Sequence, residues 1–512
     1  MAITRRTFGQ WGLGAAALAT LRPGWLAAAG AAPQPPFDMP VLVAPVFAAQ
    51  VFDIRKFGAA AGGQTACTQA LAAAIAACAG AGGGRVLVPA GVWLTGPVHL
   101  KSNVELHVAE GAELRFSPRF EDYLPPVFMQ RGGVRCYGYS PLIYARGCTN
   151  IGITGRGTLN GQGEAWWPWV KSQPGMTRLF RAGAAGVPVE QRVFASEADG
   201  VRPPFVQTIE CCNVLLEGFT LTDGPSWNIH PVCCENVIVR GVSVIAHGPN
   251  NDGIDPDSCR NVLIEDCVLD TGDDCICLKA GRDEDAWAVG KPCENVVIRR
   301  CRTRRGHGGV VLGSEMSAGI RNVFVHDCRF EGTDRGIRIK SLPGRGGFVE
   351  NVWFQDLAMD RIAGAAIHLT FRYSKSDSQT GKQPRFRNFQ IRRVTCASAK
   401  QAVEIQGLPA NYMQDVLLED VRITSRRGLS AEYARGLRLK RVDLRVASGP
   451  LFRLLDGEQV DISECPCPQG TDVFLRLEGA ATKDVRLDKA NLANARQPVE
   501  LAEGVPPGAV QQ

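Results

Sequence analysis

Residues 235–242 read ENVIVRGV and residues 260–267 read RNVLIEDC, so one pattern returns 25 residues later. Strong copies of this Asn-Val unit begin at Asn213, Asn236, Asn261, Asn295, Asn322 and Asn351, with weaker ones at Asn150, Asn388 and Asp415. The strong copies are spaced by 23, 25, 34, 27 and 29 residues. In each, a short alternating strand is followed by turn residues, and a repeat of this length predicts a solenoid of stacked coils.

Two further positions of the unit alternate between cysteine and aliphatic or aromatic residues. Two residues before the strong asparagines stand Cys211, Cys234, Cys259, Cys293, Ile320 and Val349, and six residues after them stand Phe219, Val242, Cys267, Cys301, Cys328 and Leu357. Such interchange is typical of interior positions, where a thiol behaves as a small hydrophobe. The chain is therefore predicted to be all-β, a right-handed parallel β-helix. Its aligned asparagines are expected to bond from side chain to backbone at each turn.

The first residues have the features of an export signal. Thr4-Arg5-Arg6-Thr7-Phe8 is a twin-arginine pattern, followed by a short apolar run and a small-residue stretch that offers a cleavage site. We expect residues 1–31 to be a twin-arginine signal that engages the export machinery and delivers a periplasmic or secreted bacterial protein. The apolar run is too short to span a membrane, which takes about 20 residues.

Residues 32–512 are expected to form one catalytic β-helix domain, with a core of about 51–430 and weaker coils after it. The alanine-rich stretch 65–79 predicts a helix that caps the open end of the stack. Residues 123–204 are less periodic and are predicted to form extended loops around one or two coils.

The net charge indicates the kind of binding partner, and the number of cysteines bears on whether they form disulfides. The formal net charge of +6 suits an acidic partner but is too small to indicate nucleic acid. Twin-arginine export moves folded proteins, so most of the 18 cysteines are expected to be free buried thiols; the state of Cys465 and Cys467, outside the repeat, stays open.

Four short motifs fall on consecutive repeats. They are Asn250-Asn251-Asp252, Gly272-Asp273-Asp274, Gly306-His307-Gly308 and Arg338-Ile339-Lys340. Counted from the asparagine of its own repeat, Asp273 and His307 both stand at position +12, and Asp252 and Arg338 both at +16. This count predicts one groove with three carboxylates, an imidazole and two cations. Asp255 and Asp257 are assigned to turns.

Hydrolysis of a glycosidic bond needs such a set of groups. One carboxylic acid protonates the leaving oxygen while another carboxylate activates water or attacks the sugar. Crowding of carboxylates raises the pKa of at least one of them. Arg338 and Lys340 are suited to hold an acidic sugar. No His/Cys spacing indicates a zinc site, and no metal or cofactor is expected.

At these residues the sequence resembles glycoside hydrolase family 28, the polygalacturonases, marked by Asn-Thr-Asp, Gly-Asp-Asp, Gly-His-Gly and Arg-Ile-Lys on a parallel β-helix. Asn251 stands where the family has threonine. The resemblance implies that Asp273 is the general acid, that Asp252 and Asp274 activate water, and that His307 supports the acid. It also implies inversion of the anomeric centre, with carboxyl groups roughly 6.5–9.5 Å apart.

Further substrate contacts are predicted at Asn250, Trp227, His230, Arg282 and Glu315. The long segment 123–204 is long enough to wall off one end of the groove, and the loops 287–292 and 313–317 resemble those of bacterial exo-acting members. Together they favour an exo-acting enzyme that releases galacturonic acid from a chain end. Three alternatives stay open: a hydrolase of another pectic polymer such as a substituted galacturonan or rhamnogalacturonan, a β-helix pectate lyase, and a non-catalytic carbohydrate-binding β-helix.

Overall fold

The computed structural model describes residues 33–374, 380–489 and 492–511. The chain divides into two units, Met1–Pro36 and Phe37–Gln512, and the second unit holds the helices and strands named below. The predicted twin-arginine signal, residues 1–31, lies outside the described residues. Among the residues that are described, no helix has both the length and the apolar character needed to cross a membrane.

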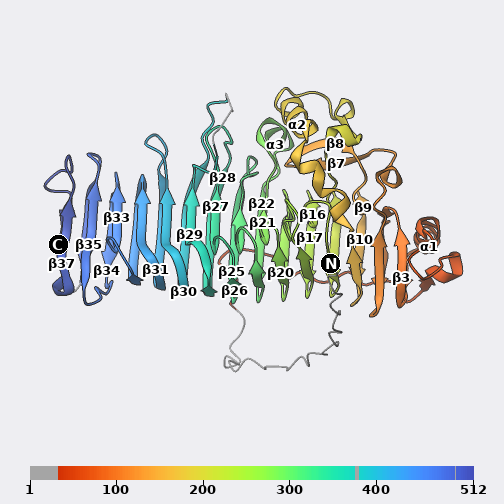
Figure 1. Ribbon diagram of the computed structural model, residues 1–512, viewed down its shortest axis with the longest axis horizontal. Coiled ribbons are helices and arrows are strands. Elements are labelled where there is room, and N and C mark those ends of the chain that lie inside the picture. Colours follow the sequence, from red (N-terminus) through yellow and green to blue (C-terminus); the bar gives the residue numbers. More distant parts are fainter. Residues whose placement is uncertain (1–32, 375–379, 490–491, 512) are drawn as a thin grey trace, which may run out of the picture. The chain divides into compact units, whose positions relative to one another are not determined.

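The second unit is a stack of coils whose successive strands pair in parallel, which confirms the predicted parallel β-helix (Figure 1). The first ladder of strands is β1 Val51–Asp53, β2 Gly84–Val88, β5 Val104–Val108, β10 Thr149–Thr154, β14 Cys212–Glu217, β17 Glu235–Arg240, β19 Arg260–Glu265, β22 Cys293–Arg299 and β25 Ile320–His326. The second is β3 Gly91–Thr95, β6 Ala112–Phe116, β11 Thr158–Asn160, β15 Thr220–Thr222, β18 Ser243–Ala246, β20 Val268–Thr271, β23 Arg302–Arg305 and β26 Arg329–Glu331.

The third ladder carries the candidate site. It consists of β4 Val98–His99, β9 Ile143–Arg146, β13 Val206–Ile209, β16 Ile229–Val232, β21 Ile276–Leu278, β24 Val310–Leu312, β27 Ile337–Lys340 and β29 Ile362–Thr370. Between β16 and β21, Ile254 bridges to Ile229 on one side and to Ile276 on the other. The ladder is therefore continuous through the coil that contains Asp252.

The coils continue beyond the expected core of 51–430. The later strands are β28 Phe348–Asp360, β30 Arg385–Gln406, β31 Met413–Glu432, β32 Ala434–Val446, β33 Phe452–Leu455, β34 Glu458–Ser463, β35 Thr471–Glu478, β36 Lys483–Asp488, β37 Ala495–Leu501 and β38 Val510–Gln511. β31, β33, β35 and β37 pair in parallel, as do β32, β34, β36 and β38. The weak C-terminal pattern thus still specifies coils.

The repeated asparagines form a ladder of side chains. The Nδ2 group of Asn261 donates to Oδ1 of Asn236 at 3.1 Å, and Asn295 donates to Asn261 at 3.2 Å. The same bond recurs from Asn150 to Asn388. Side chain bonds to side chain, and not to backbone as predicted, because each asparagine sits in the left-handed region, as with φ 58° at Asn261. Identical turns then stack their amides directly.

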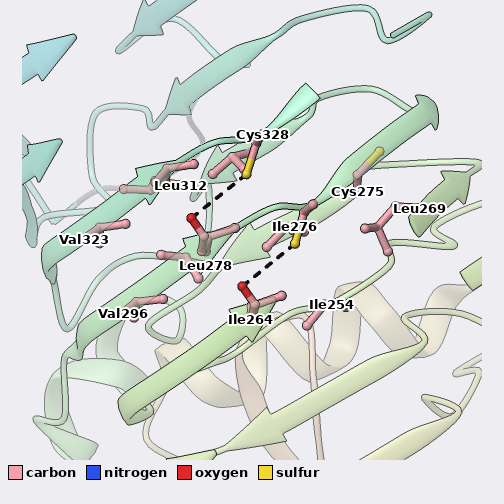
Figure 2. Close-up of a cluster of buried hydrophobic side chains, with 14 of the residues drawn as sticks. Ile254, Ile264, Leu269, Cys275, Ile276, Leu278, Val296, Leu312, Val323 and Cys328 are labelled. Atoms are coloured by element: carbon pink, nitrogen blue, oxygen red, sulfur yellow. Dashed lines mark hydrogen bonds between the residues drawn. The ribbon is translucent and has the colours of Figure 1, made fainter. Parts of the chain in front are cut away.

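The predicted interior columns are buried, and Figure 2 shows Cys275 and Cys328 among isoleucine, leucine and valine side chains of successive coils. Both Cys259 and Cys293 are completely buried, and the same holds for Ile320 in the same column. All 18 cysteines, Cys465 and Cys467 included, are free thiols. The columns are therefore packing positions.

The N-terminal end of the stack is capped as predicted, by the helix α1 (Thr68–Gly80), which buries Leu71, Ala74, Ile75 and Cys78. The segment 123–204 differs from the expected loops. Besides coil strands it holds a small lobe with its own core, made of β7 Val127–Arg131, β8 Val134–Gly138, β12 Val193–Phe194 and the helix α2 Pro174–Ala184. Figure 1 shows this lobe beside the helix α3 (Asp283–Val289), on one side of the stack.

Candidate active site

The register of the third ladder places the motif residues. Ile254 pairs with Ile276, Ile276 with Val310, and Val310 with Ile337. Asp252 and Asp274 each stand two residues before the paired isoleucine of their own coil. The two side chains are therefore neighbours on adjacent coils, about 4.8 Å of strand spacing apart.

The positions counted from the asparagines match the strand register for one pair of residues and differ from it for the other. His307 lies beside Asp273 on the next coil, and its backbone N–H donates to the Asp273 carbonyl at 2.9 Å. Asp252 and Arg338 are not equivalent, because Asp252 precedes Ile254 by two residues whereas Arg338 follows Ile337 by one. The loop 247–251 puts extra residues into the Asp252 coil before its strand, which shifts the count.

The three aspartates meet at one place. One carboxylate oxygen of each of Asp252, Asp273 and Asp274 lies within 4.8 Å of the others. The Asp252 and Asp274 side chains are 4% and 1% exposed, while that of Asp273 is 20% exposed. Asp252 and Asp274 are this close because stacked coils hold like positions at strand spacing. Asp273 alone of the three is open to a large ligand.

His307 is aligned with the most exposed of these carboxylates. Its Nδ1 lies 2.8 Å from Oδ1 of Asp273, and half of its side chain is exposed. The hydrogen bond to Asp273 raises the pKa of the His307 imidazole, against the smaller opposing effect of partial burial. An imidazole in this position can hold a proton next to the Asp273 carboxyl.

Asp274 is the ionised member of the set. Burial alone would raise its pKa, but the positive charges of Lys340, Arg338 and Lys279 outweigh burial and lower the pKa of Asp274 to about 2. Nζ of Lys340 lies 2.6 Å from Oδ2 of Asp274, and Nη1 of Arg338 lies 3.2 Å from its Oδ1. The two predicted sugar-binding cations thus contact a carboxylate of the protein.

Asp252 has the opposite electrostatic environment. Burial, followed by repulsion from Asp273, raises the pKa of Asp252 to about 8, although Lys279 opposes the shift from 3.5 Å. Its Oδ1 has no hydrogen-bond partner among the described residues. The site therefore carries a proton at neutral pH, alongside a neighbour that is ionised.

Comparison with known proteins agrees with this geometry. Residues 192–436 match the family described as "Glycosyl hydrolases family 28". A "Probable polygalacturonase" of Vitis vinifera is 32% identical over 381 residues, covering 72% of this chain and 73% of that protein. The chain belongs to glycosyl hydrolase family 28. It is a glycoside hydrolase of the polygalacturonase type.

Two further relatives place it within the family. The crystal structure of a hyperthermoactive exopolygalacturonase from Thermotoga maritima superimposes with a TM-score of 0.71 at 37% identity, covering 79% of this chain and 92% of that one. An exo-poly-alpha-D-galacturonosidase of Dickeya chrysanthemi is 29% identical, covering 70% of this chain and 64% of that protein.

The departure from the family motif has a structural explanation. Asn251, where the family has threonine, is fully buried, and its Nδ2 donates to the carbonyls of Gly224 and Ser226, both at 2.9 Å. Its Oδ1 accepts from the Gly248 N–H at 2.8 Å. Asn251 therefore ties the Asp252 loop to the preceding coil. The adjacent Asn250 accepts from Arg202 at 2.6 Å and is only half-buried.

Two of the predicted substrate contacts are corrected. His230 has no exposed surface, and its Nδ1 lies 2.8 Å from Nε2 of Gln207. Trp227 is 5% exposed, packs edge-on against His230, and has Lys279 4.4 Å from its ring centroid. The strand β7 lies against both residues, because Arg131 lies over the Trp227 ring at 5.2 Å and the Gln130 carbonyl accepts from Gln207, the partner of His230, at 2.8 Å. His230 therefore has no surface for a sugar, and Trp227 has only a small one.

The other two peripheral predictions lie at the edge of the site. The Glu315 side chain is 14% exposed, 3.4 Å from Nζ of Lys279. Burial by itself would raise the pKa of Glu315, but the positive charges of Lys279, Arg345 and Arg282 together hold it well below its usual range. Arg282 is a quarter exposed and stacks over Phe180 at 3.7 Å. Both are available at the rim.

Sequence reasoning missed the charges beneath the motifs. Asp255 and Asp257 are not turn residues, because both are fully buried and pair with neighbouring coils. Asp257 bridges to Val232 and Lys279, and the Asp255 N–H donates to the Ile229 carbonyl at 2.7 Å. Lys279 is 3% exposed and lies within 4 Å of Asp252, Asp255 and Glu315. The signal in the sequence was the alternation of side chains along a strand. Ile254, Ile276 and Leu278 point inward, so the residues that follow them, such as Asp255 and Lys279, point outward toward the site.

Proposed function

We propose that this enzyme hydrolyses α-1,4-galacturonosidic bonds of polygalacturonate, the acidic backbone of pectin, and releases galacturonic acid from a chain end. The observation that carries the proposal is the meeting of Asp252, Asp273 and Asp274 at one place, with Asp273 bonded to His307 and Asp274 bonded to Arg338 and Lys340. Hydrolysis of a glycosidic bond needs one carboxylic acid for the leaving oxygen and another carboxylate for the attacking water.

Asp273 is assigned the general acid. It is the most exposed of the three aspartates and is hydrogen-bonded to His307, which can return a proton to it. Asp252 and Asp274 lie deeper and are assigned the activation of the attacking water. Because both oxygens of Asp274 are occupied by Lys340 and Arg338, this carboxylate is poorly placed to attack the sugar itself.

The binding of both Asp274 oxygens by Lys340 and Arg338 supports inversion. A chain cut with inversion releases its first product as the β-anomer, because water attacks opposite the leaving group. Proton NMR of trigalacturonate in the first minutes of reaction measures the anomer before mutarotation. Release of the α-anomer would contradict inversion and would make Asp252 or Asp274 a nucleophile.

The substrate charge is matched by the cations around the site. Arg338 is 18% exposed and lies 5.5 Å from the ring centroid of Tyr373, so its guanidinium can meet a sugar carboxylate while it also contacts Asp274. Hydrolysis of polygalacturonate much faster than that of methyl-esterified pectin or rhamnogalacturonan is expected. Preferred cleavage of a substituted galacturonan would indicate another pectic polymer as the substrate.

Exo-action is supported by the lobe of residues 123–204. In β7, Gln130 bonds to Asp257 on the Asp252 coil and Arg131 lies over Trp227 on the coil before it, so a folded body stands at one end of the catalytic face. The named exo-acting relatives from Thermotoga maritima and Dickeya chrysanthemi agree with this assignment. A time course on polygalacturonate decides it. Monomer from the start with little loss of viscosity is expected, and rapid thinning with mixed oligomers would indicate endo-action.

A lyase is the second candidate, because oxygens of Asp252, Asp273 and Asp274 are close enough to hold a cation such as Ca²⁺. Lys340 and Lys279 already neutralise Asp274 and Asp252, which disfavours a further positive charge there. A lyase leaves unsaturated ends that absorb ultraviolet light, whereas the proposed hydrolase leaves only new reducing ends. Assays with calcium and with a chelator separate the two.

A further inference from the structure

Arg131 is a buried cation without a carboxylate or hydrogen-bond partner among the described residues. It ends the strand β7, and the residue is 4% exposed. Its side chain makes no hydrogen bond and no ion pair within the part of the chain that the structure describes, and its Nε is completely shielded. Burying a charge without a partner is costly, so such groups are normally paired. The missing partner of Arg131 is therefore informative.

The guanidinium faces the catalytic carboxylates. It lies 5.2 Å from the ring centroid of Trp227, and the same ring lies 4.4 Å from Nζ of Lys279, which is 3.5 Å from Asp252 and within 4 Å of Asp255 and Glu315. None of these carboxylates comes within ion-pair distance of the Arg131 guanidinium, so Arg131 points toward the reaction centre without being neutralised there.

The hairpin that presents Arg131 is held in place. Gln130 next to it donates to Asp257 at 2.6 Å, and the carbonyl of Gly133 accepts from the Arg282 N–H at 3.0 Å. The turn needs glycine, since φ is 57° at Gly132 and 79° at Gly133, and a Cβ at Gly133 would lie 2.8 Å from the Arg282 nitrogen. Arg131 is thus held in place by a hairpin that contacts both the coils and the start of α3.

Arg131 and Arg338 stand on opposite sides of the aspartates. Trp227, beneath Arg131, belongs to the coil before Asp252, whereas Arg338 belongs to the second coil after Asp274. A polysaccharide that lies along the stack would place one sugar near each cation. On the Arg131 side the lobe stands next to the site, so that sugar is the last of its chain.

We infer that Arg131 binds the carboxylate of the terminal galacturonate residue, on the side of the cut opposite to Arg338. The inference rests on the proposed function, which supplies an acidic chain end as the ligand. A guanidinium can meet a carboxylate through two parallel hydrogen bonds, which a neutral sugar cannot form. Arg131 thereby selects an unesterified acidic chain end.

The test compares Arg131→Gln and Arg131→Lys with a control, Arg135→Gln, in the full chain. Arg135 lies in the same hairpin, but its side chain pairs with Glu210 at 3.6 Å, away from the aspartates. On trigalacturonate, Arg131→Gln should raise KM at least about 10-fold, the loss expected for a charged hydrogen bond. Arg131→Lys should restore part of this, and Arg135→Gln should leave KM unchanged.

The methyl ester of trigalacturonate adds a second readout, because it has no carboxylate for Arg131 to bind. Its weak cleavage by the wild type should be unaffected by Arg131→Gln. An unchanged KM for trigalacturonate in Arg131→Gln would overturn the inference while the proposed function stands. A wild type that does not cleave polygalacturonate would overturn both.

A further measurement does not depend on the folding of an Arg131 variant. Hydrogen–deuterium exchange of the inactive Asp273→Asn protein should show that trigalacturonate protects residues 128–135 from exchange, whereas galactose does not. Absence of protection in this hairpin, with binding shown by calorimetry, would also overturn the inference.

Discussion

Nζ of Lys340 lies 2.6 Å from Oδ2 of Asp274, and both side chains are almost completely buried. The contact places a residue that the motif alone assigns to substrate binding against a carboxylate of the catalytic group. Lys340 is a main reason why Asp274 stays ionised next to two other aspartates. Its effect on catalysis should therefore exceed its effect on binding.

Replacement of Lys340 tests this arrangement. Lys340→Met should lower kcat by about 10²–10³, as for removal of a preorganised charge from an active site, because Asp274 would then compete with Asp252 for protons. Steady-state kinetics on trigalacturonate measure it, with Lys440→Met on a later coil as the control. A variant with an unchanged kcat and a raised KM would show that Lys340 acts only by binding the sugar.

Asp273→Asn removes the assigned acid without changing the size of the side chain. Turnover should fall by about 10²–10⁴, while trigalacturonate still binds with a Kd within a few-fold of the wild-type value. Calorimetry and product analysis give the two quantities, and Asp270→Asn, on the same coil, is the matched control. Wild-type turnover by Asp273→Asn would refute the assignment of the acid.

Asp252 should make the stability of the protein depend on pH. Its pKa is raised from 3.8 to about 8 in the folded state. The contribution of protonated Asp252 to the free energy of unfolding is therefore complete below its pKa in the unfolded chain, and it is lost as pH rises toward 8. The loss amounts to at most about 1.4 kcal/mol per pH unit. Asp252→Asn should abolish this loss.

Urea unfolding at pH 5 and pH 8 checks the prediction. The wild type should lose more free energy of unfolding between these pH values than Asp252→Asn does, with Asp461→Asn on a C-terminal coil as the control. Equal pH dependence in wild type and Asp252→Asn would mean that Asp252 is ionised in the folded protein at pH 5.

Export through the twin-arginine route is proposed from Arg5 and Arg6, which lie outside the described residues. A β-helix packed with 18 free thiols suits a protein that folds before export, in a reducing compartment. Double replacement by lysine, Arg5→Lys with Arg6→Lys, should retain active enzyme inside the cell, whereas Arg22→Lys should not. Activity assays on cell fractions measure this, and unchanged export of the double variant would contradict the route.

The repeat in the sequence was sufficient to predict the coils, because each copy places the same side chains inside and outside. Cys259 and Cys293 could be assigned to one interior column, and His307 could be placed beside Asp273, by counting from the asparagines alone. Counting failed for Asp252 and Arg338, because the loop 247–251 changes the number of residues between the asparagine and the strand.

The sequence by itself determined the fold, the family and the candidate residues for the chemistry, since these depend on a pattern that repeats locally along the chain. Only the tertiary structure decided which side chains share protons and charges. Lys279 lies against Asp252, Lys340 against Asp274, and Arg131 reaches the site from a separate lobe. The physical reason is that electrostatic effects depend on distance and burial, and a stack of coils sets both between residues that are far apart in the chain.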